Sequence, residues 1–357
     1  MSLKQSFEQN KSEQKYDASA KPVVNIDMTE CKEEDKPRMI ALVNRLSKSP
    51  CGLETLTIAA ENGFKFSFFD ASVHCFGGCD EAGHWVRLSP TASDDKLVGT
   101  LCHEARHAGQ FARGSHEAFG VKDVRSELIA FRSTEADAQT YAVTACKELE
   151  LLGEKGPYQE FKKFYPEIEK AFDTAYKAAG NKITHEVMTE TFDGWYDQLG
   201  TKTVYEESYQ VNPMIQEIYD LKQGKKPTLF YNKEKVSGEE AIALAGWTKN
   251  GNYYTKDPNR LESGKFLDVA ETSMKDMEEF FKMRKELTGM EPDPSLKTLP
   301  TRPDTLERKR PKMGEKPVAN KYEMKDRILA NKQQYEAGLK VAEKVAFAKA
   351  AAMKKVR

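Results

Sequence analysis

The sequence predicts an α+β protein in which a small sheet precedes a series of helices, and three observations lead to this prediction. Short apolar and aromatic runs, separated by glycine and proline turn signals, lie between residues 64 and 89. Two longer segments with apolar residues at helical spacing follow, at 94–113 and 123–152. From 157 to 290 the pattern is again mostly helical. A chain of 357 residues can bury an ample core in one large domain or two.

The individual elements are expected in the following order. Short helices at 37–48 and 53–62, the second stopped by Gly63, precede strands at 64–69, 73–76 and 85–89. The glycine-rich stretch 77–83 is interpreted as a turn between two strands. Beyond residue 153, helices are expected at 157–179, 184–199, 204–223, 238–246 and 264–288. Asn250-Gly251 predicts the turn of a hairpin-like stretch at 247–254.

Composition divides the chain into five parts. Residues 1–36 are rich in Lys, Glu, Gln and Ser and are expected to be disordered. Residues 291–320 carry six prolines and are expected to form an extended linker. The parts are a disordered segment at 1–36, a core at 37–153, a helical extension that completes the domain at 154–290, a Pro-rich linker at 291–320 and a basic helical tail at 321–357.

The net charge of −1 conceals an asymmetry between the body and the C-terminal end. Residues 296–357 hold 17 Lys and Arg against 7 Asp and Glu, so this end carries about +10 and the rest about −11. The run Arg308-Lys309-Arg310-Pro311-Lys312 is a candidate contact for nucleic acid or an acidic partner. It lacks the interleaved aromatic residues of a base-stacking site, which favours a solvated or partner-docking tail.

The sequence also bounds the compartment. No apolar run reaches membrane-spanning length, and residues 1–8 lack the apolar core of a secretory signal. Six cysteines are scattered, and Cys102 and Cys146 fall inside helical patterns, where a buried thiol is the usual state. These features favour a reducing compartment, and the cytoplasm is expected.

The most informative feature is the run His103-Glu104-Ala105-Arg106-His107, an HExxH pattern within the helix expected at 94–113. Two histidines four residues apart lie on one helix face, where both imidazoles can bind one Zn²⁺ with the intervening glutamate beside the metal-bound water. Ser93 is the expected N-cap of this helix and Gly114 its stop signal.

A catalytic zinc site needs a third protein ligand, and the following helix offers two glutamates. Glu135 lies 28 residues beyond His107, which leaves room for a loop and a returning antiparallel helix. Small residues, Ala138 and Ala142, share its face and permit close approach of the two helices. Glu127 is the rival, but bulky residues follow it, so Glu135 is the favoured ligand.

The HExxH pattern followed by Glu135-Ala136-Asp137-Ala138 resembles the gluzincin zinc metallopeptidases, whose fold is the zincin-like core. Residues 50–220 are most similar to an uncharacterised family of putative bacterial metallopeptidases, which pairs such a core with helices bearing Trp195-Tyr196 and Tyr205-Glu206. Some gluzincins carry an aspartate four residues after the ligand glutamate. Here that position is Gln139, and Asp137 comes two residues after Glu135.

This resemblance and the chemistry together imply a zinc-dependent metallopeptidase that hydrolyses a protein or peptide substrate. His103, His107 and Glu135 would hold Zn²⁺, and Glu104 would act as the general base. His185, Tyr196 and Tyr205 are unranked candidates for a second oxyanion donor, and strand 85–89 is expected to pair with an extended peptide.

Three alternatives stay open. The chain could be a catalytically silent zincin-fold protein that binds or supports a partner, although an intact Glu104 argues against loss of catalysis. It could instead be an interaction protein recruited through its basic tail. Cys75 and Cys79, with His74 and His84 near, could form a second metal site or a disulfide, although a glycine turn between strands is favoured there.

Overall fold

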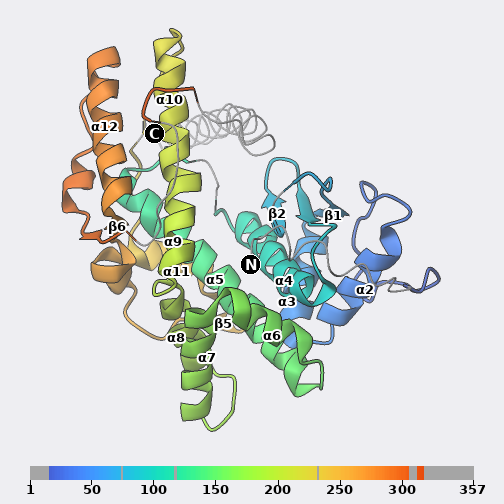
Figure 1. Ribbon diagram of the computed structural model, residues 1–357. Coiled ribbons are helices and arrows are strands. Elements are labelled where there is room, and N and C mark those ends of the chain that lie inside the picture. The colour runs from blue at the N-terminus through green and yellow to red at the C-terminus, as the bar shows by residue number, and fades with distance from the viewer. Residues whose placement is uncertain (1–15, 74, 116–118, 231–232, 305–311, 317–357) are drawn as a thin grey trace, which may run out of the picture. The chain divides into compact units, whose positions relative to one another are not determined.

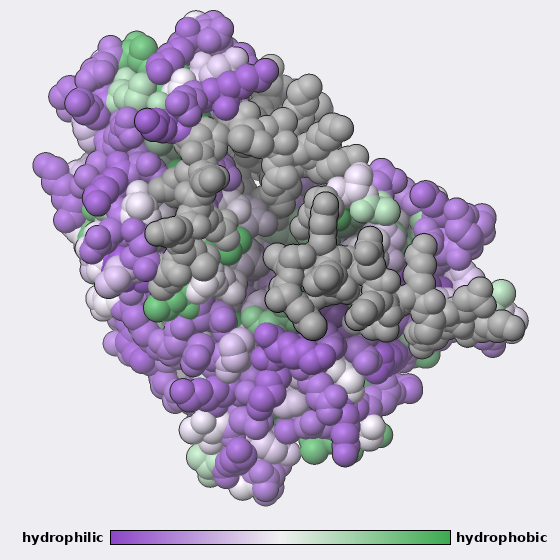
Figure 2. Space-filling model, in the orientation of Figure 1, coloured by the Kyte–Doolittle hydropathy of each residue, from purple (hydrophilic) through white to green (hydrophobic). Residues whose placement is uncertain are grey.

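The structure is a computed structural model that describes residues 16–73, 75–115, 119–230, 233–304 and 312–316. This part of the chain is mostly helical with small sheets, as Figure 1 shows, which confirms the α+β class. The expected basic tail at 321–357 and the charged run from Arg308 to Pro311 lie outside the described residues. No helix among the described residues is long and apolar enough to cross a membrane, and the face seen in Figure 2 is largely hydrophilic.

The first part of the chain combines helices with a three-stranded sheet. Helices α2 (Lys36–Leu46) and α3 (Pro50–Glu61) precede strands β1 (Lys65–Phe68), β2 (Gly77–Asp80) and β3 (Trp85–Leu88). The sheet order is β1-β3-β2, with β3 parallel to β1 and antiparallel to β2. Helices α4 (Asp94–Ala112) and α5 (Val124–Leu151) follow, and α4 packs against the sheet, α3 and α5.

Helix α5 is contacted along its length by several of the helices that follow it. The following helices are α6 (Gly156–Phe164), α7 (Pro166–Ala178), α8 (His185–Trp195), α9 (Leu199–Glu206), a π-helical turn η1 (Glu207–Val211), α10 (Asn212–Lys222), α11 (Gly238–Ala245) and α12 (Glu271–Thr288). Short 3₁₀ helices occur at η2 (Pro258–Glu262), η3 (Gly264–Phe266) and η4 (Pro294–Thr298). Two small sheets complete the set, an antiparallel pair β4 (Trp247–Thr248) and β5 (Gly251–Asn252) and a parallel pair β6 (Val269–Ala270) and β7 (Thr301–Arg302). Figure 1 shows α10 and α12 side by side.

Proline accounts for two differences from the expected helices. The helix expected at 157–179 is divided at Tyr165, because a residue that precedes proline is disfavoured in the helical region, and Pro166 opens α7. The helix expected at 204–223 begins earlier and contains the π turn η1 just before Pro213. Since Pro213 has no backbone N–H and its ring crowds the preceding turn, a wider turn there relieves the clash.

Glycine accounts for another difference. A strand is expected at 73–76 and a turn at 77–83. In the structure the strand, β2, lies at Gly77–Asp80, within the expected turn. A Cβ on Gly77 would stand 2.5 Å from Thr100 and 2.9 Å from Glu104, so glycine allows the strand to run directly against α4. The expected hairpin at 247–254 is present as β4–β5, with Lys249 and Asn250 at its turn.

The two ends of the described chain also pack more closely than composition predicts. Val24, Ile26 and Cys31 are buried, and the Phe66 N–H donates to the Asp27 carbonyl, so this segment contributes to the core and Asp27 pairs with β1. In the stretch expected to be a linker, Leu296 and Leu299 are buried and β7 pairs with β6. Residues 291–304 therefore form a segment that packs on the protein, although they are rich in proline.

Candidate metal centre

Helix α4 presents the HExxH residues toward the protein interior. The Ser93 hydroxyl caps the helix by accepting from the Lys96 N–H at 3.3 Å, and Gly114 follows its end with a positive φ of 94°. Both boundary predictions are confirmed. His103, Glu104 and His107 are only 7–8 % exposed, which is far below the usual exposure of such polar residues.

Helix α5 returns along α4 and brings Glu135 to the two histidines. A Cβ on Gly99 of α4 would stand 3.1 Å from the Cys146 Sγ of α5, so the helices approach closely at that point. Gly99 faces Cys146 while His107 faces Glu135, so the two helices are antiparallel. The buried alanines Ala136, Ala138 and Ala142 on α5 fit the expected close approach.

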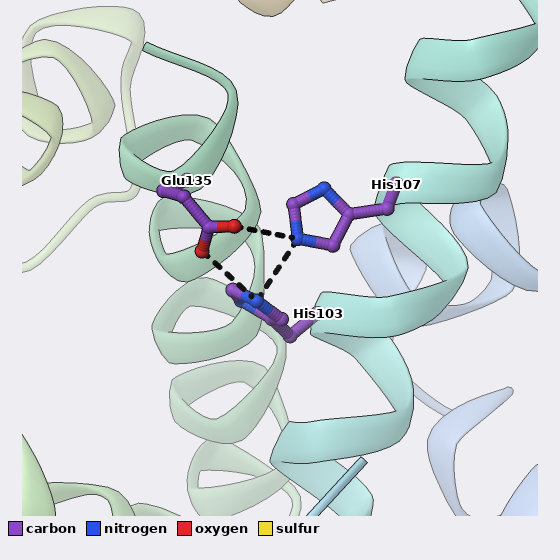
Figure 3. Close-up of side chains that lie close together, drawn as sticks. All are labelled: His103, His107 and Glu135. Atoms are coloured by element: carbon purple, nitrogen blue, oxygen red, sulfur yellow. Dashed lines mark hydrogen bonds and ion pairs between the residues drawn. The ribbon is translucent and has the colours of Figure 1, made fainter. Parts of the chain in front are cut away.

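Three side-chain groups converge between these helices, as Figure 3 shows. The Nε2 atoms of His103 and His107 are 3.0 Å apart. The two carboxylate oxygens of Glu135 lie 3.4 Å from the His103 Nε2 and 3.5 Å from the His107 Nε2. Among the described residues, this buried His-His-Glu set is the group of histidine, cysteine and acidic side chains able to hold a metal ion.

The dimensions and chemistry of this set fit a metal. Tetrahedral ligands at about 2.0–2.1 Å from a zinc ion lie about 3.3–3.4 Å from one another, close to the three separations seen here. Two imidazole nitrogens and one carboxylate are also a common donor set of catalytic zinc sites.

Gln110 determines which nitrogen of His107 carries the proton. Its Nε2 donates to the Thr134 carbonyl at 2.9 Å and to Asp137 Oδ2 at 2.6 Å, so its Oε1 must be the atom 2.7 Å from His107 Nδ1. That oxygen can only accept, and His107 Nδ1 therefore carries the proton. The lone pair of the His107 Nε2 is consequently free to face the centre of the site.

Asp137 anchors this hydrogen-bond chain. Its carboxylate is fully buried and accepts from Arg106 at 2.7 and 3.0 Å and from the Tyr253 hydroxyl at 3.0 Å. The Arg106 guanidinium also stacks 3.7 Å from the Tyr141 ring centroid. Asp137 thus supports His107 through Gln110, although it lies two residues after Glu135 rather than four.

Two tyrosines border Glu135. Burial alone would raise the pKa of the Glu135 carboxyl, but the His107 and His103 imidazoles and a hydrogen bond from Tyr205 outweigh burial and lower it. Burial and the nearby carboxylates raise the pKa of Tyr205 well above its ordinary value, so its hydroxyl keeps its proton at neutral pH. Burial likewise raises the pKa of Tyr165 to about 12, and Glu104 and Glu135 contribute.

The structure separates the three oxyanion candidates. It brings Tyr205 to Glu135, whereas Tyr196 packs in an aromatic cluster with Trp195 and Phe266. His185 is exposed at the first residue of α8. Tyr165 was missed by sequence reasoning, because aromatic residues between 158 and 176 fit a core pattern. The break at Pro166 was the signal available in the sequence.

Glu127, the rival to Glu135, is engaged elsewhere. Its carboxylate accepts from the backbone N–H groups of Gly120 and Lys122, each at 2.9 Å, and so closes the loop before α5. Its bonds go to this loop, whereas Glu135 faces the imidazoles.

The sheet corrects the expected peptide-binding strand. Strand β3 contains Trp85–Leu88 and is the central strand, with β1 and β2 on its two sides, so it has no edge for a peptide. Among the described strands, β2 pairs with β3 alone and borders α4. Cys75, which precedes β2, and Cys79, its third residue, form no disulfide.

Comparison with known proteins supports a metal-dependent role. The model of the Putative metallopeptidase family (DUF6782) matches residues 14–218, which include the His-His-Glu set and Tyr205. No curated protein and no solved structure matches the chain. A metallopeptidase requires a metal, and the buried set of His103, His107 and Glu135 is able to hold one. Since the match covers more than half of its residues, the chain belongs to the Putative metallopeptidase family.

Proposed function

We propose that the protein is a zinc-dependent peptidase with a zincin-like core, in which His103, His107 and Glu135 hold Zn²⁺. The observation that carries this proposal is the triangle formed by the two Nε2 atoms and the Glu135 carboxylate, with separations of 3.0, 3.4 and 3.5 Å. When bound there, zinc would supply a Lewis acid that polarises a peptide carbonyl and lowers the pKa of water towards about 7.

Glu104 is the general base in this proposal. It follows His103 directly on α4, is 8 % exposed, and its Oε1 lies beside Gly77 of β2. Its carboxylate takes a proton from the attacking water and delivers that proton to the nitrogen of the leaving amine. Because Gly77 has no side chain, the Glu104 carboxylate lies directly against the backbone of β2.

Tyr205 is the proposed donor to the oxygen of the scissile carbonyl. Its hydroxyl stands beside Glu135 and stays protonated at neutral pH, for the reasons given above. A hydroxyl has one proton, so Tyr205 would redirect it from Glu135 to this oxygen, where a donor already held at the site stabilises the developing negative charge. We assign the peptide itself to the edge of β2, Gly77–Asp80, where it would add an antiparallel strand.

Metal content and cleavage by matched variants test the proposal. Purified protein should carry one zinc ion per chain, and His103→Ala should lose both metal and cleavage. Glu104→Gln should keep the metal and lose cleavage, measured by comparing the new N-termini produced by wild type and variant in a protein mixture. His185→Ala, an exposed histidine on α8, is the matched control and should keep both.

Each failure has a distinct meaning. Wild-type protein that binds zinc no better than His103→Ala would overturn the metal site. Stoichiometric zinc with equal cleavage by wild type and Glu104→Gln would overturn the assigned base. Stoichiometric zinc without any cleavage would favour a silent zincin-fold binding protein.

A further inference from the structure

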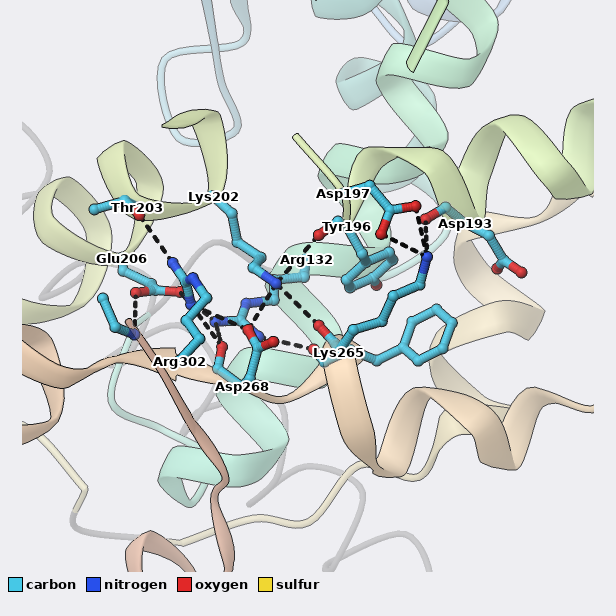
Figure 4. A network of polar contacts seen from close by, with 12 residues as sticks. Arg132, Asp193, Tyr196, Asp197, Lys202, Thr203, Glu206, Lys265, Asp268 and Arg302 are labelled. Atoms are coloured by element: carbon cyan, nitrogen blue, oxygen red, sulfur yellow. Dashed lines mark hydrogen bonds and ion pairs between the residues drawn. The ribbon is translucent and has the colours of Figure 1, made fainter. Parts of the chain in front are cut away.

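A buried network of charged side chains lies beside the candidate site, and Figure 4 shows it. Arg132, Glu206 and Lys202 are at most 1 % exposed, and Arg302 is 6 % exposed. The Glu206 carboxylate accepts from Arg132 at 2.6 Å, from Arg302 at 2.7 Å and from the Ala270 N–H at 3.1 Å. Charges so deeply buried are stable only when each has close partners.

Two members of this network adjoin residues of the site. Arg132 lies on α5, one helical turn before Glu135, and also donates to the backbone carbonyls of Phe266 and Asp268. Glu206 directly follows Tyr205 at the end of α9. The ring of Tyr205 packs against Phe131, at 5.7 Å between centroids, so α9 and α5 also meet beside this charge pair.

The third member comes from far along the chain. Arg302 belongs to β7, and its guanidinium donates to Glu206, to the Asp268 side chain at 3.1 Å and to the Thr203 hydroxyl at 2.9 Å. Thr203 and Glu206 lie on α9, on either side of Tyr205. Arg302 therefore ties the one turn of α9 that carries Tyr205 to the β6–β7 pair.

We propose that Arg302 is a positioning residue of the peptidase site, which holds Tyr205 against Glu135 through Glu206. This inference rests on the proposed function. It extends the working domain beyond the family match, which ends at residue 218, to the segment 299–304. Without Arg302, Glu206 keeps Arg132 and the Ala270 N–H, but α9 loses its bonds to β7.

A double-mutant cycle on zinc affinity tests this role in the full-length protein. Arg302→Met and Tyr205→Phe should each weaken zinc binding about tenfold. Loss of a residue that hydrogen-bonds to a metal ligand typically lowers metal affinity about 10–100-fold. The double variant should bind zinc as tightly as Tyr205→Phe alone, since the two substitutions remove the same interaction. Arg302→Lys, which keeps the charge but not the fork of donors, should restore part of the affinity.

Arg284→Met is the matched control. Arg284 is a buried arginine with its own glutamate partner, Glu217 at 3.4 Å, on α12 and α10. The Arg284→Met variant should lose about as much unfolding free energy as Arg302→Met, while its zinc affinity stays within about twofold of the wild type. Additive losses in the cycle, or an equal loss of affinity in Arg284→Met, would overturn the positioning role.

A readout without metal separates this proposal from the proposed function. Amide hydrogen exchange of α9, Leu199–Glu206, should accelerate at least tenfold in Arg302→Met but not in Arg284→Met. If wild-type protein binds no zinc, the proposed function fails, while faster exchange confined to α9 would still support the tie from β7. Unchanged exchange of α9 would overturn it.

Discussion

Replacement of Gln110 by methionine tests whether Gln110 orients His107 as a ligand of the proposed metal. Gln110 is fully buried and makes three short hydrogen bonds, to His107, Thr134 and Asp137. Methionine has a similar length but neither accepts strongly nor donates, so His107 Nδ1 loses the acceptor that fixes its proton. Lost supports of this kind weaken metal binding about 10–100-fold, or about 1.4–2.7 kcal/mol.

Competition with a chromophoric zinc chelator measures the effect. Asp137 keeps Arg106 and Tyr253, so the unfolding free energy should fall by only about 1–3 kcal/mol and the variant should remain folded. Gln210→Met is the matched control, since Gln210 is buried and its Oε1 has no hydrogen-bond partner among the described residues. Equal zinc affinities of Gln110→Met and Gln210→Met would refute the assigned tautomer.

Three further substitutions probe other parts of the molecule. Gly77→Ala places a Cβ 2.5 Å from Thr100 and 2.9 Å from Glu104, so cleavage should fall at least tenfold with zinc retained; unchanged turnover would contradict the role of the β2 edge. Glu127→Met removes the oxygen that accepts from Gly120 and Lys122, so it should leave zinc affinity unchanged but expose the loop 120–122 to faster proteolysis; a loss of zinc would restore Glu127 as a ligand candidate. Lys96 lies within 4.2–4.6 Å of the rings of Phe76, Phe164 and Tyr165, and burial lowers its pKa from 10.5 to about 8. Because the unfolded chain then binds more protons between about pH 8 and 10.5, the stability contributed by this group rises with pH across that window. Lys96→Met should be more stable than the wild type near pH 7, by up to about 3 kcal/mol, with the difference shrinking towards pH 10 in urea titrations; a constant difference would show that the three rings fully compensate for burial.

Local patterns in the sequence predicted the parts of the site that depend on one helix or on a pair of neighbouring helices. The cap at Ser93, the spacing of His103 and His107 and the small residues after Glu135 are all visible within a few turns. The preference for Glu135 over Glu127 rested on which helix face can approach closely, and the structure brings Glu135 to the imidazoles.

The contributions that sequence reasoning could not supply come from residues far apart in the chain. Glycine at position 77 locally favours a turn. In the structure, however, glycine is required there because Thr100 and Glu104 of α4 leave no room for a Cβ. Prolines between 291 and 304 suggested a linker, although Leu296 and Leu299 are buried. A single arginine in such a segment, Arg302, carries no local sign that it meets Glu206, because that contact spans 96 positions.

The length of α5 has a consequence for how such a protein can change during evolution. This helix of 28 residues carries Glu135 near its middle, while its first turn is tied to Asp293 and Glu148 near its end accepts from Cys51. The proposed metal centre therefore lies on a helix that is held in place by both halves of the protein. Recombination that exchanged the chain after residue 153 would replace the residues, such as Asp293, that hold the first turn of α5. Loops such as that between α7 and α8, remote from both anchors in sequence, are where insertions should accumulate at least cost.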